Sequence, residues 1–261
     1  MIGFLIKKTF YDLWDNMFKI VVINIGFIAA TAIPIFLPRF VARFINSTAL
    51  EIALSAFGIL FCSVYLAAVA VSVKPISDYS SFSFGDFLRG FKIAWPAGLV
   101  MGFLIFLLYM VATIILPFYI AFESSVGLVL AAVIFWATVF ALLSFQYFFT
   151  VYIRLGSKKI YKSFKKCMLV FLDNSGFSLF LFLHNTVVLL ISLIFFFLFP
   201  GPAGILLYLD EALRLRLLKY DWLEANPDAD RRKIPWDVIL IEEREKNPSR
   251  TFKNFIFPWK D

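Results

Sequence analysis

Five long apolar runs constrain the fold of this chain more than any other feature of its sequence. They cover residues Met17–Leu37, Leu50–Val73, Trp95–Leu116, Val126–Val151 and Phe177–Phe199. Each has at least 20 residues, and a helix rising about 1.5 Å per residue then crosses about 30 Å of hydrocarbon. Because only 16% of the 261 residues are charged, the chain could not cover the surface of a soluble domain. The sequence therefore predicts an all-α, multi-pass membrane protein.

A sixth, weaker run follows the sequence Pro-Gly-Pro and extends from Ala203 to Leu218. Four charged residues interrupt it: Asp210, Glu211, Arg214 and Arg216. With six spans, 18 of the 20 Lys and Arg residues that precede the distal tail lie on one side of the membrane, and only Arg39 and Arg43 lie on the other. Since basic residues are retained on the cytoplasmic side, we predict six spans with both termini in the cytoplasm.

A lysine-rich segment precedes the fifth run. Its five lysines are Lys158, Lys159, Lys162, Lys165 and Lys166. On a helix they lie opposite an apolar stripe formed by Ile160, Tyr161, Phe164, Cys167 and Met168. This pattern is typical of a helix in the membrane surface with its lysines toward anionic headgroups. Nucleic-acid binding would place aromatic rings beside the cations for base stacking. We therefore expect contact with the lipid bilayer and no nucleic-acid partner.

Similar amphipathic segments, at residues 4–18 and 82–95, precede two other spans. The span after each of the three segments ends at a proline: Pro38, Pro117 or Pro200. We interpret this order as a threefold repeat of surface helix, outward span and return span, over about residues 1–80, 81–157 and 158–218. The predicted fold is a six-transmembrane helical bundle built from three helical-hairpin repeats with amphipathic surface helices. Residues 1–218 would form the membrane domain, and residues 219–261 a cytoplasmic C-terminal tail.

Three segments also carry a resemblance to a known family. They are FSFGDFLRGFKIAWPAGLVMGFL (Phe82–Leu104), the asparagine-containing first span ending in IPIFLP, and FFLFPGPAGILLYLDEALRLRLL (Phe196–Leu218). In these patterns of Phe, Gly and Pro the chain resembles the YesL-like family of bacterial integral membrane proteins over about residues 1–218. The resemblance implies a polytopic protein of the bacterial cytoplasmic membrane, with relatives often associated with carbohydrate uptake. It assigns no catalytic residue.

Ionisable residues inside a span are candidates for function, because an unpaired charge there costs several kcal/mol. Arg214 follows Asp210 by four residues and Glu211 by three, so we expect it to neutralise one of these carboxylates within the helix. The pair could form a binding or proton-handling site, but we favour a short sixth span with a charged cytoplasmic end. For His184 and Asn185 in the fifth span, hydrogen bonds between helices are favoured over a proton relay.

The sequence contains no recognisable catalytic or metal-binding motif. Cys62 and Cys167 suggest neither a disulfide nor a metal site, and His184 is the single histidine. We therefore expect no enzymatic activity, no metal and no cofactor. An intramembrane enzyme that uses Asp210 and Glu211 is the least favoured hypothesis.

The tail gives the remaining clues to function. A helix is expected to stop at residues 224–227, and a short helix over Pro235–Pro248 is expected to dock on another surface. Residues 250–261 combine aromatics and cations, which suits the bilayer interface and a protein partner equally well. We predict a transport-associated membrane component that contacts a cytoplasmic or membrane protein through its basic face and tail. The alternative is a non-transporting scaffold or assembly factor.

Overall fold

The structure is a computed structural model that describes residues 1–122, 124–156, 159–231 and 233–246. These residues form helices joined by short connections, and they contain no β-strand. The helices are α1 (Ile2–Asp15), α2 (Met17–Ala42), α3 (Thr48–Ser77), α4 (Phe84–Met110), the π-helical turn η1 (Val111–Ile115), α5 (Leu116–Ile120), α6 (Ser125–Phe145), α7 (Phe148–Arg154), α8 (Ile160–Asp173), α9 (Ser175–Ile194), α10 (Gly201–Ala225), α11 (Trp236–Ile239) and α12 (Ile241–Lys246).

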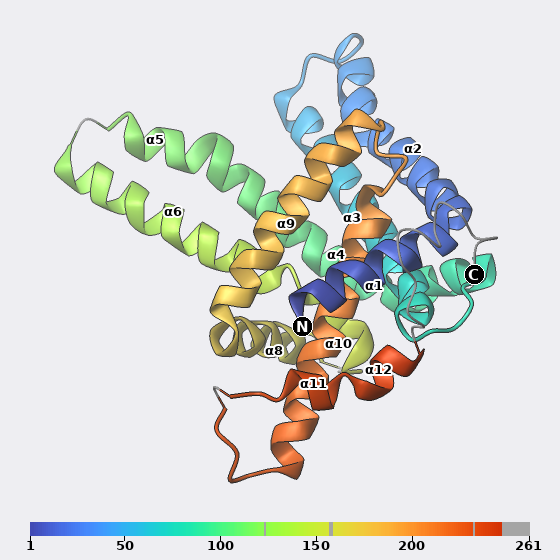
Figure 1. Cartoon of the computed structure of the whole chain (residues 1–261). Helices are drawn as coiled ribbons and strands as arrows, with labels where there is room; N and C mark the ends of the chain where they lie inside the picture. Colours follow the sequence, from blue (N-terminus) through green and yellow to red (C-terminus); the bar gives the residue numbers. More distant parts are fainter. Residues whose placement is uncertain (123, 157–158, 232, 247–261) are drawn as a thin grey trace.

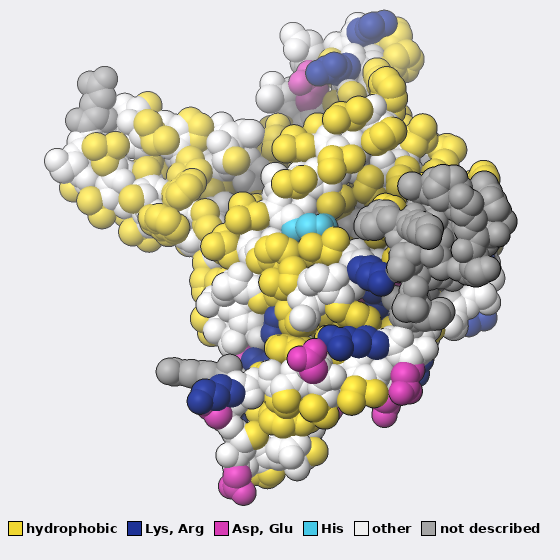
Figure 2. All heavy atoms as spheres, viewed as in Figure 1, with side chains coloured by type: hydrophobic (Ala, Val, Ile, Leu, Met, Phe, Trp, Pro, Cys, Tyr) yellow, Lys and Arg dark blue, Asp and Glu magenta, His cyan; other side chains and the backbone are white. Residues whose placement is uncertain are grey.

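Within the described residues, five helical segments are long and apolar enough to cross a membrane. They are Met17–Ala42, Thr48–Ser77, Phe84–Ile120, Ser125–Arg154 and Ser175–Ile194. Their large apolar side chains point outward over much of their length, as the hydrophobic surface in Figure 2 shows. Such a surface is stable in lipid and would be costly in water. The structure therefore fits a multi-pass integral membrane protein, as the sequence predicts.

α10, the predicted sixth span, has a different environment from these five helices. It runs through the middle of the bundle in Figure 1 and contacts α1, α2, α3, α7 and α9. Almost every residue from Ala203 to Leu215 is buried, including Asp210 and Glu211, whereas Arg214 is partly buried. Its first turn is fixed to α2 by Asn24, whose side chain donates to the carbonyl oxygens of Leu198 and Pro200 and accepts from the Ala203 backbone amide. α10 is thus a buried helix that packs against α1, α2, α3, α7 and α9.

The amphipathic segments differ from the prediction in one of three cases. α1 and α8 are separate helices, and each ends at an asparagine, Asn16 or Asn174, whose side-chain amide donates to the carbonyl four residues earlier. Residues 82–95 do not form a separate surface helix. Instead they begin α4, which Ser83 and Asp86 cap and which continues to Met110. No asparagine interrupts the backbone hydrogen bonds there, so the helix runs on into the span.

Two further features complete the architecture. η1 and α5 extend α4, and with α6 they form a hairpin that projects from the body in Figure 1. In the tail, the helix predicted over Pro235–Pro248 is instead two short helices, α11 and α12, separated at Leu240. Leu240 is fully buried, so this segment docks on the bundle of its own chain. Residues 250–261 lie outside the described part of the chain.

Candidate functional site

Two adjacent carboxylates on α10 lie in the interior of the bundle. The side chains of Asp210 and Glu211 are each about 1% exposed. Because a buried carboxylate is stable only when its charge is compensated, both need partners from neighbouring helices. Those partners define the candidate site, which we call the ionic cluster. Its charged members are Lys8, Asp12, Lys74, Asp78, Arg154, Asp210, Glu211, Arg214 and Glu243.

Asp210 is paired with Arg154, the last residue of α7. Arg154 Nε donates to Asp210 Oδ1 at 2.8 Å, and Nη2 donates to the other carboxylate oxygen. The remaining terminal nitrogen, Nη1, lies 2.9 Å from Asp78 Oδ1. This side-on, two-bond geometry is among the strongest ways in which a protein compensates a buried carboxylate. It fixes the end of α7 against the middle of α10.

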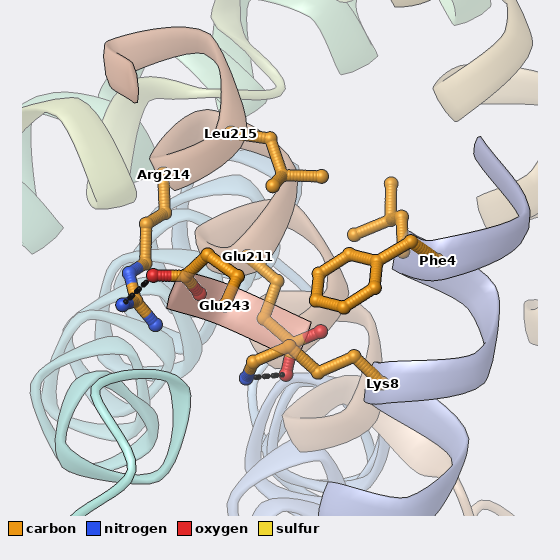
Figure 3. Close-up of a pocket in the computed structure, with 7 residues that line it drawn as sticks. Phe4, Lys8, Glu211, Arg214, Leu215 and Glu243 are labelled. Carbon is orange, nitrogen blue, oxygen red and sulfur yellow. Dashed lines mark hydrogen bonds and ion pairs between the residues drawn. The ribbon is translucent and has the colours of Figure 1, made fainter. Parts of the chain in front are cut away.

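Glu211 is paired with α1. Lys8 Nζ lies 3.1 Å from Glu211 Oε1 and also pairs with Asp12, and the Thr9 hydroxyl donates to Glu211 Oε2. Figure 3 shows Lys8 and Glu211 pointing toward each other between their two helices. Lys8 is itself only 3% exposed, so a helix expected on the membrane surface extends one lysine inward. α1 is therefore anchored to α10 by charge as well as by apolar contact.

The predicted pairing of Arg214 with Asp210 or Glu211 is wrong. Arg214 Nη2 instead donates to Glu243 Oε1 of α12 at 2.7 Å, and Nη1 donates to the backbone carbonyl of Ser77. The two acids of α10 take their cations from α7 and α1, and Arg214 binds the tail. The charged segment is consequently not the simple solvent-exposed end of a short span that we favoured from sequence.

The end of α3 joins these pairs. The Ser77 carbonyl accepts from Lys8 and Arg214, and its hydroxyl accepts from Arg154 at 2.8 Å. Asp78 forms ion pairs with Arg154 and Lys74. Partial burial alone would raise the pKa of Asp78, but the hydrogen bond from Lys74 and the charge of Arg154 hold that pKa below its usual value. One turn of backbone thus contacts α1, α7 and α10.

Tyr79 ends α3 in a left-handed conformation, with φ 58°. The Ser80 amide donates to the Pro75 carbonyl and the Tyr79 amide to the Ile76 carbonyl, which is the Schellman pattern of helix termination. Glycine is the usual residue at this position, and another residue costs about 1–2 kcal/mol there. The tyrosine ring lies against Lys8 and Arg214, and its hydroxyl donates to Glu243 Oε2 at 2.9 Å. These contacts explain how the structure stabilises a side chain at a position that favours glycine.

A small pocket adjoins the cluster. It encloses about 190 Å³ including its open mouth. Its polar wall is formed by Lys8, Glu211, Arg214 and Glu243, and its apolar wall by Phe4, Leu5 and Leu215. Figure 3 shows these side chains converging from α1, α10 and α12. The pocket therefore lies at the junction of the tail with the membrane domain.

The other predicted site residues lie elsewhere. The His184 ring stacks on Tyr208 of α10, with ring centroids 3.9 Å apart and 13° between the ring planes. His184 Nδ1, Asn185 Oδ1 and the Tyr208 hydroxyl find no hydrogen-bond partner in the described part of the chain. The interhelical hydrogen bonds expected for His184 and Asn185 are therefore not formed at His184 Nδ1 and Asn185 Oδ1 among the described residues. No ion pair among the described residues links His184 or Asn185 to the ionic cluster.

The lysine segment forms α8, with Lys158 outside the described residues. Lys159, Lys162 and Lys165 are exposed, whereas Lys166 is partly buried and its Nζ lies 3.4 Å from the Leu155 carbonyl oxygen. Of the predicted apolar stripe, Cys167 is buried and Phe164 and Ile160 pack against the core. Tyr161 and Met168 are instead 63% and 38% exposed. The helix therefore has the predicted polar face, but its apolar face is only partly covered by protein.

Most partners of Asp210 and Glu211 were not predicted from the sequence. For Lys8 and Arg154 the sequence predicts only a position on the basic side of the membrane. It does not predict Thr9, Tyr79 or Glu243 as site residues. One usable signal is present, since buried acids need cations, and any charge that Arg214 and Arg216 do not compensate must be compensated by another helix. Which cation it would be depends on how the helices assemble, and sequence spacing does not contain that information.

The described residues contain no group of three or more His, Cys, Asp or Glu side chains that could hold a metal ion. The arrangement is chemically one of compensated charges that join helix ends. Comparison of the chain with protein-family models, with curated proteins and with solved structures gives no match.

Proposed function

We propose that this protein is a six-span auxiliary component of the bacterial cytoplasmic membrane, associated with a transport system and not itself a channel for the transported solute. Both termini would lie in the cytoplasm, and the chain would be a relative of the YesL-like proteins. The observation that carries the proposal is that the buried acids of α10 are compensated by cations of the same chain. Charged residues that hold helix ends together stabilise one arrangement of the helices. This suits a scaffold better than a transport pathway, in which the helices alternate between arrangements.

The six-span arrangement is supported by the return of the chain to the ionic cluster. α2 leaves from the end of α1 and α3 returns to Ser77, which accepts from Lys8 at 3.2 Å. α4 then leaves, and α7 returns to Arg154, which reaches Ser77 and Asp78. α9 leaves next, and α10 returns with Asp210 and Glu211. Three successive excursions that meet at one layer are what three hairpins through a bilayer would produce.

The cytoplasmic location of this layer is supported by its basic residues. Lys7 and Lys8 on α1, Arg154 on α7 and the exposed lysines of α8 belong to the side on which α3 and α7 end. Arg39 and Arg43 lie at the other end of α2. Retention of Lys and Arg on the cytoplasmic side thus supports a cytoplasmic position for both the N-terminus and the docked tail.

A second candidate, transport through the bundle itself, is favoured by polar atoms of His184, Asn185 and Tyr208, between α9 and α10, that have no hydrogen-bond partner among the described residues. Buried polar atoms without partners are unusual in native proteins and mark possible contacts of a solute or of internal water. This candidate assigns the solute contact to the His184–Tyr208 stack and a structural role to the ionic cluster.

Flux into proteoliposomes separates the two candidates. For the auxiliary role, we expect the purified chain to carry none of a panel of radiolabelled mono- and disaccharides. Mild cross-linking in native membranes should then join it to a transport subunit identified by mass spectrometry. Sugar uptake that is lost in Tyr208→Phe and His184→Phe but retained in Lys162→Gln, an exposed control, would contradict the auxiliary role and establish the carrier.

A further inference from the structure

Glu243 is the one carboxylate of the ionic cluster that comes from the tail. It lies on α12 and is only 4% exposed, whereas its neighbours Glu242 and Glu245 are exposed. Its Oε1 accepts from Arg214 at 2.7 Å, and its Oε2 accepts from the Tyr79 hydroxyl at 2.9 Å. Figure 3 shows Glu243 meeting Arg214 over the pocket. The tail thus places a single carboxylate into the ionic cluster.

The cluster is electrically balanced without that side chain. The membrane domain contributes four cations, Lys8, Lys74, Arg154 and Arg214, and four acids, Asp12, Asp78, Asp210 and Glu211. Glu243 adds a ninth charge. The buried helix ends therefore do not need the tail for neutrality, and the tail is the member that can leave without stranding a buried acid.

Arg214 and Tyr79 form a receptor for a carboxylate. The other carboxylate near Arg214 is that of Asp78, whose Oδ1 is 3.9 Å from Nε, so the closer carboxylate contact is supplied by Glu243. Tyr79 is held at a positive φ with its ring over Lys8 and Arg214 and its hydroxyl toward the same carboxylate. The Tyr79 hydroxyl and the Arg214 guanidinium therefore donate to the two oxygens of one carboxylate.

We propose that Arg214 and Tyr79, with Lys8 behind the tyrosine ring, form a carboxylate-binding site that Glu243 occupies as a tethered ligand. The tail is then a detachable plug, which the Glu243 carboxylate holds in this site. Leu240 and Trp236 position the tail on the bundle, because Leu240 is fully buried and Trp236 packs beside Arg216. This inference does not depend on the transport-associated role proposed above.

Release of the tail after backbone cleavage tests the plug. A protease site is inserted between Asp228 and Ala229 of the full-length protein in lipid nanodiscs, the chain is cut, and retention of the C-terminal fragment is followed by size exclusion. We expect the wild-type fragment to stay bound and the Glu243→Gln fragment to dissociate roughly tenfold faster or more, since a charge-assisted hydrogen bond is weakened. Glu242→Gln is the matched control and should behave as wild type. Equal dissociation of the Glu243→Gln and wild-type fragments would overturn the proposal.

Competition tests the binding site without any change to the protein other than the cut. A synthetic peptide covering Pro235–Lys246 is added to the cut complex, in one version with its own Glu243 and in the other with glutamine there. We expect the glutamate peptide to displace the fragment at a roughly tenfold lower concentration than the glutamine peptide. Displacement at the same concentration by both would show that apolar contacts alone hold the tail, and the carboxylate site would be rejected.

Discussion

Asp210 and Arg154 show how an apolar bundle accommodates a charged residue in its interior. The aspartate is 1% exposed, and both its oxygens accept from one guanidinium. The pair leaves neither oxygen without a donor, so α10 can carry the carboxylate in the buried part of the bundle. The arginine in turn reaches Ser77 and Asp78, and its charge is shared between two helices. Such a residue stabilises an assembly of helices rather than a substrate.

Replacing Asp210 with alanine should destabilise the protein by about 3–5 kcal/mol, because it leaves the Arg154 guanidinium buried without its principal counter-charge. The measurement is thermal or denaturant unfolding in detergent micelles. Asp237→Ala is the control, since Asp237 is 91% exposed and its pair with Arg244 should contribute about 1 kcal/mol or less. Equal effects of the two substitutions would show that Asp210 is not a buried structural partner.

Prediction from sequence reached the acids of this site but not their partners. Asp210 and Glu211 stand out because they interrupt an apolar run, and that reasoning is local. Their cations lie 56 and 203 residues away along the chain. Sequence spacing favoured Arg214, which lies on the same helix as the two acids, but in the structure Arg214 pairs with Glu243 of α12. Tertiary position decides which opposite charges meet, and a single sequence contains no measure of it.

Helix-to-helix contact between α3 and α4 depends on glycines. A Cβ added at Gly98 would lie 2.5 Å from the Val64 Cα atom, and one at Gly90 would lie 2.7 Å from the Ala68 carbonyl oxygen. Both neighbours are backbone atoms, which cannot move aside without shifting the helix. Gly98 therefore lets the two backbones approach closely.

Gly98→Leu should therefore separate α3 from α4 and destabilise the protein by about 1–3 kcal/mol or more, as overpacking does. The change is read from the unfolding midpoint and from monodispersity in detergent. Gly176→Leu, near the start of α9, is the control, because a Cβ there meets nothing within 4 Å. A Gly98→Leu protein as stable as the Gly176→Leu protein would contradict the close contact.

The corner between α8 and α9 is joined to α10 by a smaller polar group. Lys219 Nζ lies 2.8 Å from Asp173 Oδ2, and the Tyr220 hydroxyl donates to the same oxygen at 3.0 Å. Partial burial alone would raise the pKa of Asp173, but the hydrogen bonds from Lys219 and Tyr220 hold it below its usual value. A lowered pKa means that the ionised aspartate stabilises the folded state.

The stabilisation from Asp173 should be fully present above pH of about 4, where the unfolded chain is also ionised, and should fade as the pH falls through the lower folded pKa. Wild type should thus unfold at a higher temperature than Asp173→Asn at pH 7, with the difference shrinking below pH of about 4. Unfolding midpoints at pH 7, 5 and 3.5 test this. A difference that grows toward acid pH would reverse the assigned sign.

Element boundaries were predictable where a local signal existed. The breaks after α1 and α8 follow the side-chain chemistry of Asn16 and Asn174, and the end of α10 at Ala225 precedes the predicted Asn-Pro stop. The segment 82–95 has the same amphipathic composition as α1, yet it continues straight into α4. Amphipathicity thus identified helices, but only residues that compete for backbone hydrogen bonds separated them.

On the scale of the whole molecule, the bundle has a body and a projecting hairpin. α10 lies at the centre of the body, and η1, α5 and α6 extend from it (Figure 1). Phe122, Val126 and Trp136 in the hairpin are 61%, 70% and 67% exposed. Their exposure is expected for side chains facing lipid. It explains why composition alone identified the membrane class. The central position of α10, in contrast, could be seen only in the structure.

Sidedness is the most direct test of the account. Single cysteines are placed at Asn46, between α2 and α3, at Lys162 on α8 and at Glu242 on α12, in a chain with Cys62→Ala and Cys167→Ala. Intact cells are then treated with a membrane-impermeant maleimide. We predict that the cysteine at position 46 is labelled from outside, and that those at 162 and 242 are labelled only after the membrane is permeabilised. Labelling of positions 46 and 162 from the same side, or of 162 and 242 from opposite sides, would contradict the three-hairpin arrangement.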